Sequence, residues 1–442
     1  MRHGGNEALI RTPVPAHSDE ADATSDDTSW LARGERHVWR PYCQHRAAPP
    51  PLPIVGSRGT RLLLADGREL VDGLASWWTA AHGYKHPHIV RRIQEQLERL
   101  PHVAFGGLAH EAAYTLAERL ANALPPPLTR VFFVESGSVA VEVAVKMAIQ
   151  SLHNRGHRGR RRVVAFEGAY HGDTFATMAL CDPATGMHRA FAGFGLDVLH
   201  LPLPVEGDGF DAAFDRIAAD AACAIVEPLV QCAGGFRFNS PRALKRLRSA
   251  CDRHGIVLVF DEIATGFHRT GRRFALLEAG VVPDIVVLGK ALTGGMLPMA
   301  AAIASEAVFD AFLGEDVDKA LQHGPTYMAN ALACAAAHAS LDLFEKNDMR
   351  VAVARIEAAM REGLSQVRAR RNVKDVRVCG AIGVVEMQPG TAPPSVLFAE
   401  RGVFVRPLRL GHADLVYLMP PLVADERDMG ILLGAIEGCI PR

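Results

Sequence analysis

Two neighbouring stretches decide the fold: Ile-Val-Leu-Val-Phe-Asp-Glu at 256–262 and Asp-Ile-Val-Val-Leu-Gly-Lys at 284–290. In each, an unbroken apolar run ends close to a charged residue. Apolar runs without polar alternation predict strands that are buried on both faces, as in a mostly parallel sheet covered by helices. We therefore expect strands at 256–260 and 285–288, with Asp261 and Lys290 just past their carboxyl ends. Ligands of such sheets bind at that edge.

Similar apolar runs continue the pattern along the chain and alternate with helical stretches, which predicts an α/β fold. A helix is indicated by Ile89, Ile93, Leu97 and Leu100, whose spacing forms a core-facing stripe. A second helix is expected from about 138 to 152. The further strands are expected at 130–134, 162–166 and 224–226.

The length of 442 residues corresponds to two or three domains at roughly 150 residues each. After residue 370 the sequence changes to short strands, expected at 376–378, 383–386, 403–406 and 415–419, and a helix at about 425–439. We predict a large domain over 76–344 and a smaller α+β domain built from 29–75 and 345–442. Residues 1–28 are polar and lack an apolar period, which predicts a disordered tail.

Composition excludes several classes of protein. Hydrophobic residues make up 49% and charged residues 22%, and the net charge of -1 gives no drive toward nucleic acid or an anionic membrane. No stretch approaches the roughly 20 apolar residues needed to span a bilayer. The eight cysteines are scattered without a CxxC pair, which predicts reduced thiols rather than disulfides or a metal site. We expect a cytoplasmic enzyme without metal.

Reactive residues follow the expected strands, and a parallel sheet would bring them to one edge. A lysine amine (Lys290), a carboxylate (Asp261), an aromatic ring (Tyr170) and a helix start at Gly137 and Ser138 match the aldehyde, ring nitrogen, ring face and phosphate of pyridoxal 5'-phosphate. Each signal is ambiguous alone. The lysine could be a surface charge, the aspartate part of an acidic turn, the serine an ordinary N-cap and the tyrosine a rim residue of the core.

Longer motifs carry a family resemblance. FDEIATGFHRTG (260–271) followed by DIVVLGKALTGG (284–295) resembles the class III, fold-type I, pyridoxal-phosphate-dependent aminotransferases. Other segments are similar to the biotin-pathway branch of that family, in order and with few gaps from about residue 35 to 425. These are DGLASWW (72–78), HGYKHPH (82–88), HVAFGGLAHE (102–111), SGSVAVEVAVKMA (136–148), YHGDTFATM (170–178), CDPATGMH (181–188), HGPTYMANALACA (323–335), VRVCGAIGVVE (376–386) and VYLMPP (416–421).

The resemblance implies a role for each matching cofactor position. Lys290 would be the Schiff-base lysine and proton shuttle, Asp261 would pair with the pyridine nitrogen, and Tyr170 would stack near the ring and contact substrate. Gly137 and Ser138 would hold the phosphate.

The resemblance further implies a homodimer with shared active sites, in which Pro325 and Thr326 of the second subunit assist at the phosphate. The implied substrate-recognition positions are Tyr42, Trp77, Gly324 and Arg406, with Asp173 and Arg269 as weaker candidates.

The implied reaction is a ping-pong transamination that converts 8-amino-7-oxononanoate to 7,8-diaminononanoate, with S-adenosylmethionine as donor. Lysine replaces that donor in some relatives, so the donor stays open. A long chain that ends in a carboxylate needs an apolar tunnel and a distant cation. Strand alternation places Phe404 and Arg406 on one face, which suits carboxylate binding. Without the resemblance, an edge-strand arginine that faces water would be the preferred interpretation.

Two departures from the family pattern bear on the pocket. His268 stands where the family usually has glycine, so the loop that carries Arg269 is expected to differ. Several additional residues lie between Arg406 and Tyr417, which changes the local pocket shape.

Other functions remain open at this point. They are a class III transaminase of ω-amino acids or diamines, an aminomutase on the same scaffold that needs no external donor, and a non-catalytic scaffold protein. Turnover of ornithine or β-alanine would favour the first, and return to the pyridoxal form without an added keto acid would favour the second. A cellular role that survives Lys290→Ala would favour the third.

Overall fold

The computed structural model describes residues 28–184, 188–191, 193–204 and 209–442. The predicted disordered tail therefore lies outside the described residues, apart from Thr28, which directly precedes helix α1 (Ser29–Glu35). None of the helices within these ranges is long and apolar enough to cross a membrane.

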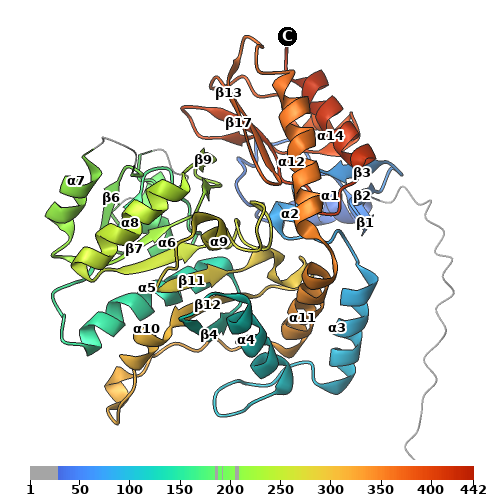
Figure 1. Cartoon of the computed structure of the whole chain (residues 1–442). Helices are drawn as coiled ribbons and strands as arrows, with labels where there is room; N and C mark the ends of the chain where they lie inside the picture. The colour runs from blue at the N-terminus through green and yellow to red at the C-terminus, as the bar shows by residue number, and fades with distance from the viewer. Residues whose placement is uncertain (1–27, 185–187, 192, 205–208) are drawn as a thin grey trace, which may run out of the picture.

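A seven-stranded sheet forms the centre of the molecule, in the order β4-β12-β11-β10-β7-β5-β6 (Figure 1). All neighbouring strands pair in parallel except at β12, which is antiparallel to both β4 and β11. The mostly parallel sheet is thus confirmed. Its strands are β4 (Leu128–Val134), β5 (Arg162–Phe166), β6 (Val198–Leu201), β7 (Ala221–Val226), β10 (Val257–Asp261), β11 (Ile285–Leu288) and β12 (Ala300–Ser305).

The apolar runs supply two separate cores because successive side chains of a strand point to opposite faces. Val257 and Val259 of β10 pack with buried residues of helix α5 (Gly137–Asn154). Leu258 and Phe260 belong to the core on the other face, with α4, α8 and α11. The helices around the sheet are α4 (Glu111–Ala123), α6 (Phe175–Leu180), α7 (Phe210–Ile217), α8 (Pro241–His254), α9 (Ala275–Ala279), α10 (Glu306–Asp310) and α11 (Ala331–Lys346), with 3-10 turns η1 (Arg189–Phe191), η2 (Lys290–Thr293) and η3 (Val317–Lys319).

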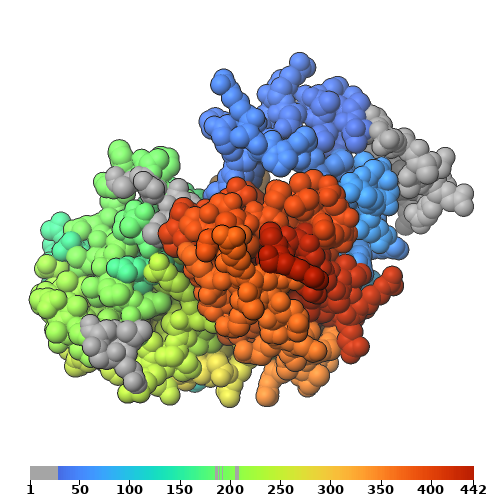
Figure 2. Space-filling model, turned by 90° about the horizontal axis from the view of Figure 1, so that it is seen from above, coloured from blue at the N-terminus to red at the C-terminus, as the bar shows by residue number. Residues whose placement is uncertain are grey.

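The two ends of the chain come together beside this sheet. In Figures 1 and 2 the blue N-terminal elements lie against the orange and red C-terminal ones. The C-terminal sheet has the order β13-β14-β17-β16, and the N-terminal sheet β1-β2-β3 includes β15 as its fourth strand. The bounds are β1 (Ile54–Arg58), β2 (Arg61–Leu64), β3 (Glu69–Asp72), β13 (Val373–Cys379), β14 (Ile382–Met387), β15 (Val403–Phe404), β16 (Leu408–Arg409), β17 (Asp414–Leu418), α12 (Met349–Ser365), α13 (Ser395–Ala399) and α14 (Glu426–Cys439).

The strand expected at 403–406 is short and joins the N-terminal sheet, where Val403 and Phe404 pair in parallel with Val71 and Asp72. The sequence did not predict which sheet this strand joins. This pairing supports our proposal that 29–75 and 345–442 form one domain beside a large domain of 76–344. The remaining short strands are β8 (Val230–Gln231) and β9 (Arg237–Phe238).

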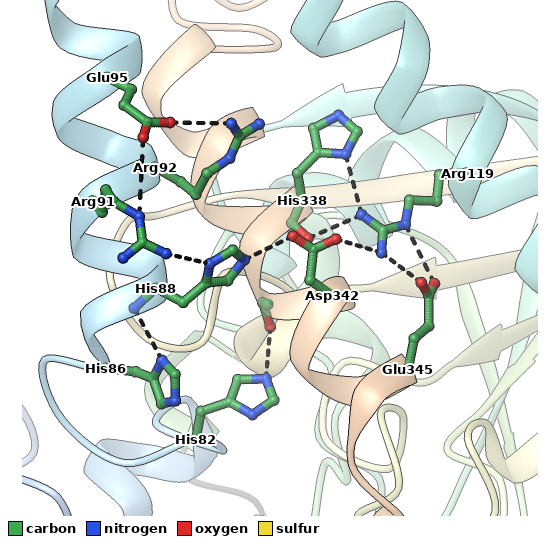
Figure 3. A network of polar contacts seen from close by, with 11 residues as sticks. His82, His86, His88, Arg91, Arg92, Glu95, Arg119, His338, Asp342 and Glu345 are labelled. Carbon is green, nitrogen blue, oxygen red and sulfur yellow. Dashed lines mark hydrogen bonds and ion pairs between the residues drawn. The ribbon is translucent and has the colours of Figure 1, made fainter.

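Helix α11 is held between α3 (Pro87–Arg99) and α4 by a chain of charges (Figure 3). The carboxylate of Asp342 accepts from His88 at 2.7 Å and pairs with Arg119 at 2.8 Å. In α3, Ile89 is buried, but Leu97 is 54% exposed, so the expected stripe was wrong at that position. The inner face of α11 carries Ser340, which lies beneath the turn that holds Lys290.

Candidate active site

A hollow of about 180 Å³ lies at the carboxyl edge of the central strands. It receives residues from the ends of β10 and β11 and from the turn that precedes α5, as expected for ligand sites of parallel sheets. Its walls are formed by Trp78, Ser136, Gly137, Ser138, Tyr170, His171, Gly172, Glu227, Asp261, Ile263, Ala264 and Lys290.

Lys290 begins the 3-10 turn η2 directly after β11, with a positive φ of 45°. Its Nζ lies 4.3 Å from the ring centroid of Trp78. Burial lowers the pKa of Lys290 below the ordinary lysine value, although the neighbouring thiol of Cys232 and the carboxylates of Asp261 and Glu227 oppose this shift. The neutral, nucleophilic amine is therefore more accessible than in a surface lysine.

The turn that carries Lys290 is tied down from α11. The hydroxyl of Ser340 donates to the carbonyl oxygen of Ala291 at 3.1 Å. Because that hydroxyl has a single proton, its oxygen must accept from Nε2 of His82, 3.1 Å away. Burial lowers the pKa of His82 to about 3, so the ring stays neutral, and its unprotonated Nδ1 is a buried acceptor without a hydrogen-bond partner among the described residues. This pair stabilises an unusual backbone conformation.

Asp261 ends strand β10 and is 4% exposed. Its Oδ2 accepts from Nδ1 of His171 at 2.8 Å, and its Oδ1 accepts from the backbone N–H of Ile263 at 3.1 Å. These bonds fix the plane of the carboxylate toward the hollow.

A second buried carboxylate, Glu227, accepts from the backbone N–H groups of Tyr170 at 2.9 Å and Cys232 at 2.8 Å. Burial raises its pKa to about 7, and the charge of Asp261 adds to the effect. Glu227 thus anchors the segment that carries Tyr170.

The start of α5 forms the opposite wall of the hollow. Ser136 is the N-cap, and its side chain accepts from the N–H of Val139 at 3.4 Å. The expected helix start at Ser138 was therefore wrong by one residue, since Gly137 opens the helix. Ser138 Oγ accepts from the N–H of Asp173 at 3.2 Å. A Cβ at Gly137 would lie 2.8 Å from Ile263, so only glycine leaves this helix end open.

Tyr170 belongs to a cluster of polar side chains at the mouth of the hollow. Its hydroxyl donates to Asp173 Oδ1 at 2.8 Å, and its ring stacks on His188 at 6.1 Å between centroids. Tyr42 donates to the other carboxylate oxygen of Asp173 and lies 3.2 Å from the hydroxyl of Tyr170. Hydrogen bonding from His188 is the largest cause that lowers the pKa of Asp173, to about 2. The mouth therefore carries a fixed negative charge.

Arg406 lies on the exposed side of the same mouth. It donates from Nη2 to the carbonyl of Tyr42 at 3.0 Å, and its guanidinium lies 5.6 Å from the ring centroid of Trp77. Arg406 makes no ion pair with any carboxylate among the described residues, so its charge is available to an anionic ligand. Trp77 is 45% exposed and meets Tyr42 edge to face at 6.1 Å.

Arg269 does not line the hollow. It is 2% exposed and donates to the carbonyls of Ala381 at 3.3 Å and Pro420 at 2.7 Å. Burial lowers its pKa to about 10. In this chain Arg269 therefore ties its loop to the turn between β13 and β14 and to the segment after β17.

Gly324, Pro325 and Thr326 also lie away from the hollow of their own chain. Gly324 and Thr326 are exposed, and a Cβ at Gly324 would meet no atom within 4 Å. Their segment precedes α11, and nearby His323 contacts Lys146 of α5 at 3.1 Å.

Both departures from the family pattern have a structural explanation. His268 adopts a positive φ of 69°, the region that favours glycine, and its Nδ1 lies 3.2 Å from the carbonyl of Gly271. The segment between Arg406 and Tyr417 contains β16, which pairs with β17 and forms the fourth strand of the C-terminal sheet.

Seven wall residues were not predicted as site residues, among them Trp78, His171 and Glu227. A signal existed for His171 and Glu227, because both follow strands at the same edge of the sheet. Trp78 had no such signal, since its position over Lys290 depends on the left-handed backbone of Ala75–Trp78.

The residues present fit pyridoxal 5'-phosphate. An amine of lowered pKa, a fixed buried carboxylate and an open helix N-terminus surround one hollow, in the places that an aldehyde, a ring nitrogen and a phosphate require. Tyr170 and Trp78 supply aromatic walls.

Comparisons with known proteins agree with this geometry. The model of the class-III aminotransferase family matches residues 42–440. The adenosylmethionine-8-amino-7-oxononanoate aminotransferase of Mycobacterium leprae is 42% identical over 90% of this chain and 94% of its own length. That of Corynebacterium glutamicum is 38% identical over 92% and 97%.

Solved structures give the same result. The adenosylmethionine-8-amino-7-oxononanoate aminotransferase of Methanocaldococcus jannaschii has a TM-score of 0.87 and 29% identity, covering 93% of this chain and 98% of its own. An amine transaminase from an uncultivated Pseudomonas species, in its pyridoxal-phosphate-bound form, has a TM-score of 0.84 and 29% identity over 91% and 98%. The chain therefore belongs to the class-III aminotransferase family.

Proposed function

We propose that this chain is the transaminase that converts 8-amino-7-oxononanoate to 7,8-diaminononanoate in biotin biosynthesis, with pyridoxal 5'-phosphate as cofactor and S-adenosylmethionine as amino donor. The observation that carries the proposal is the juxtaposition of three groups. A buried lysine amine faces a fixed carboxylate inside the hollow, and an unpaired arginine lies at its mouth. The names of the relatives support the choice of substrate.

Different residues of this chain have different roles in the proposed reaction. Bound pyridoxal 5'-phosphate supplies an aldehyde and an electron-withdrawing ring, which together allow an amino group to be exchanged for an oxo group. Lys290 carries a proton to and from the reacting carbon, aided by its lowered pKa. Asp261 would hold a proton at the ring nitrogen of the bound cofactor, and His171 keeps that carboxylate in place. Arg406 binds the substrate carboxylate.

The active enzyme is proposed to be a homodimer with shared active sites. Two observations support this: Gly324, Pro325 and Thr326 are displaced from their own hollow, and Tyr327 beside them is 59% exposed. We also propose a cytoplasmic location, supported by eight cysteines that are all unpaired. Sedimentation of the purified protein, and mixing of a Thr326 variant with a Lys290 variant to seek restored activity, test the shared site.

The decisive experiment for the reaction is a donor panel. Purified protein is incubated with 8-amino-7-oxononanoate and either S-adenosylmethionine, lysine, ornithine or β-alanine, and diamine formation is followed by mass spectrometry. We expect product with S-adenosylmethionine. Robust turnover of ornithine or β-alanine without any use of the oxononanoate would refute the assignment. Borohydride reduction and digestion should yield a pyridoxyl adduct on the Lys290 peptide.

A further inference from the structure

The segment Ala75–Trp78 forms one turn of helix with the wrong hand. All four residues have positive φ, from 45° at Ala75 to 72° at Trp78, and none is glycine. Their backbone bonds run from Trp78 N to Leu74 O at 2.7 Å and from Thr79 N to Ala75 O at 2.8 Å. A left-handed conformation costs roughly 1–2 kcal/mol for each such residue, so the surrounding structure must enforce this turn.

Asp72 is the residue that enforces it. Its carboxylate is fully buried and accepts from the N–H of Leu74 at 2.8 Å, from the N–H of Ser76 at 2.7 Å and from the hydroxyl of Tyr84 at 2.5 Å. Tyr84 is itself fixed, because its backbone N–H donates to the carbonyl of Gly59 at 2.6 Å. The two carboxylate oxygens of Asp72 thus hold the backbone N–H groups of Leu74 and Ser76 at the start of the turn, and the hydroxyl of Tyr84 holds the carboxylate.

The turn places two adjacent tryptophans in different parts of the site. Trp78 is 6% exposed and lies over the Lys290 amine, with its ring edge to face against Phe236 and Tyr417. Trp77 points toward the mouth, beside Arg406. The parallel pairing of β3 with β15 explains this proximity, because the chain leaves both strands at the same edge, once toward Trp77 and once toward Arg406.

We infer that Asp72 and Tyr84 are positioning residues for substrate length, through the left-handed turn that spaces Trp78 from Trp77. The indole of Trp78 marks the reacting end of the substrate, and the indole of Trp77 marks its carboxylate end. Both tryptophans are adjacent residues of one fixed turn, so the directions of their side chains set the chain length that fits both ends at once. The inference rests on the proposed function for its substrate, a long amino-oxo carboxylate, and assigns discrimination by length to a part of the chain that touches no reacting atom.

The test uses Asp72→Asn and Tyr84→Phe in the holoenzyme, with Asp414→Asn as the matched control. Asp414 is also a buried carboxylate that accepts a backbone bond, from Ala392 N at 2.9 Å, but it lies in the C-terminal sheet. The first readout is the ratio of kcat/KM for 8-amino-7-oxononanoate to that for the homologue shorter by one methylene. One methylene is worth about 10-fold or more in a fitted apolar site.

We expect this ratio to fall toward one in Asp72→Asn and Tyr84→Phe and to keep its value in Asp414→Asn. A purely structural role would lower turnover of both substrates equally and leave the ratio unchanged. An unchanged ratio in the folded variants would overturn the inference, as would an equal fall in the control. If Asp72→Asn does not fold, Tyr84→Phe decides, because it removes a single hydroxyl.

A second readout requires no turnover. Titration calorimetry with nonanoate and with octanoate measures the same length preference through binding alone, and near-ultraviolet circular dichroism reports the environment of the indoles. Failure of the wild-type protein to aminate the oxononanoate would refute the proposed function. Loss of the nonanoate preference in the two variants would still support the turn as the length-setting element, and its persistence would overturn that assignment.

Discussion

His171 and Asp261 are joined by a hydrogen bond of 2.8 Å between Nδ1 and Oδ2, and both side chains are enclosed by the protein. The histidine therefore donates its short side-chain bond to the carboxylate that faces the hollow, while its Nε2 is buried without a partner in the part of the chain that the structure describes. This pairing fixes the direction in which Asp261 presents its charge.

Replacing His171 by phenylalanine is expected to lower kcat about 10- to 150-fold. A hydrogen bond to a charged group is worth about 1.5–3 kcal/mol, and each 1.4 kcal/mol corresponds to a factor of ten. His171→Asn keeps a donor near Oδ2 and should retain more activity than His171→Phe. His338→Phe, which changes a part-buried histidine of α11 outside the hollow, serves as control. Equal activity of the Asn and Phe variants would contradict this prediction.

The lowered pKa of Lys290 predicts reactivity in the cofactor-free protein. Burial favours the neutral amine, so acylation of Lys290 by a small reagent should reach its plateau at a lower pH than the 10.5 of an ordinary lysine. Asp261→Asn removes a charge that opposes this shift, so the midpoint should move lower still. Peptide mass spectrometry can compare Lys290 with Lys245, an exposed lysine of α8, in the same sample. Indistinguishable profiles would refute the prediction.

Two buried glutamates predict how stability depends on pH. Burial raises the pKa of both Glu227 and Glu262 to about 7, from 4.5. The folded chain then binds each proton more tightly than the unfolded chain. The stabilising contribution is therefore full below pH 4.5 and is lost as the pH rises through 7, by up to about 3 kcal/mol for each group.

Denaturant unfolding between pH 4.5 and 7 checks this expectation. Glu262→Gln should reduce the fall in free energy of unfolding without changing the absorbance of bound cofactor, because Glu262 caps α9 through Ala275 N and Leu276 N. Glu227→Gln should reduce the fall and also change the absorbance. A fall of wild-type size in both variants would show that other groups titrate.

Ser340→Ala tests the tie between α11 and the Lys290 turn. We expect a loss of about 1 kcal/mol in stability from the missing bond to Ala291, together with weaker retention of the cofactor. Ser151→Ala is the matched control, since Ser151 is equally buried and donates only within α5, to Ala148 at 2.9 Å. Ser340→Thr keeps the hydroxyl and should restore cofactor retention. If the control loses cofactor to the same extent, the tie has no specific role.

Arg406→Ala is expected to raise KM for the oxo acid by about 10- to 150-fold, with a smaller change in kcat, because it removes a charge-assisted contact to a remote part of the substrate. Arg409→Ala changes an exposed arginine of the neighbouring β16, which donates to Ala392 at 3.4 Å, and should leave KM unaltered. Steady-state kinetics with varied oxo acid distinguish the two. A wild-type KM in Arg406→Ala would place the carboxylate elsewhere.

The sequence predicted the carboxyl edge of the sheet because an apolar run and the charged residue that follows it are neighbours in the sequence. β5 and β11 match their predicted bounds, since buried parallel strands are continuous apolar runs. β12 escaped prediction because Ala-Ala-Ala-Ile-Ala-Ser has little strand propensity, and its conformation follows from pairing with β4 and β11. The pairing of β15 with β3 was not predicted, because pairing partners far apart in the sequence leave no local trace.

The same distinction applies to the site. Lys290 and Asp261 lie at the edge where their strands predicted them, whereas the bond between His171 and Asp261 depends on how the loop that carries His171 meets the end of β10. The conformation of Ala75–Trp78 has no sequence signal, because left-handed backbone is ordinarily marked by glycine and this segment contains none. Only the buried carboxylate of Asp72 explains it.

Glycine at position 75 or 76 would remove the steric penalty that these residues bear, at the smaller cost of a more flexible unfolded chain. A lineage selected for heat tolerance alone would accordingly drift toward glycine here, and the indoles would lose their fixed spacing. A substitution that raises thermal stability at this turn would therefore lower the selectivity for substrate length. Consensus-based stabilisation of such enzymes should leave it untouched.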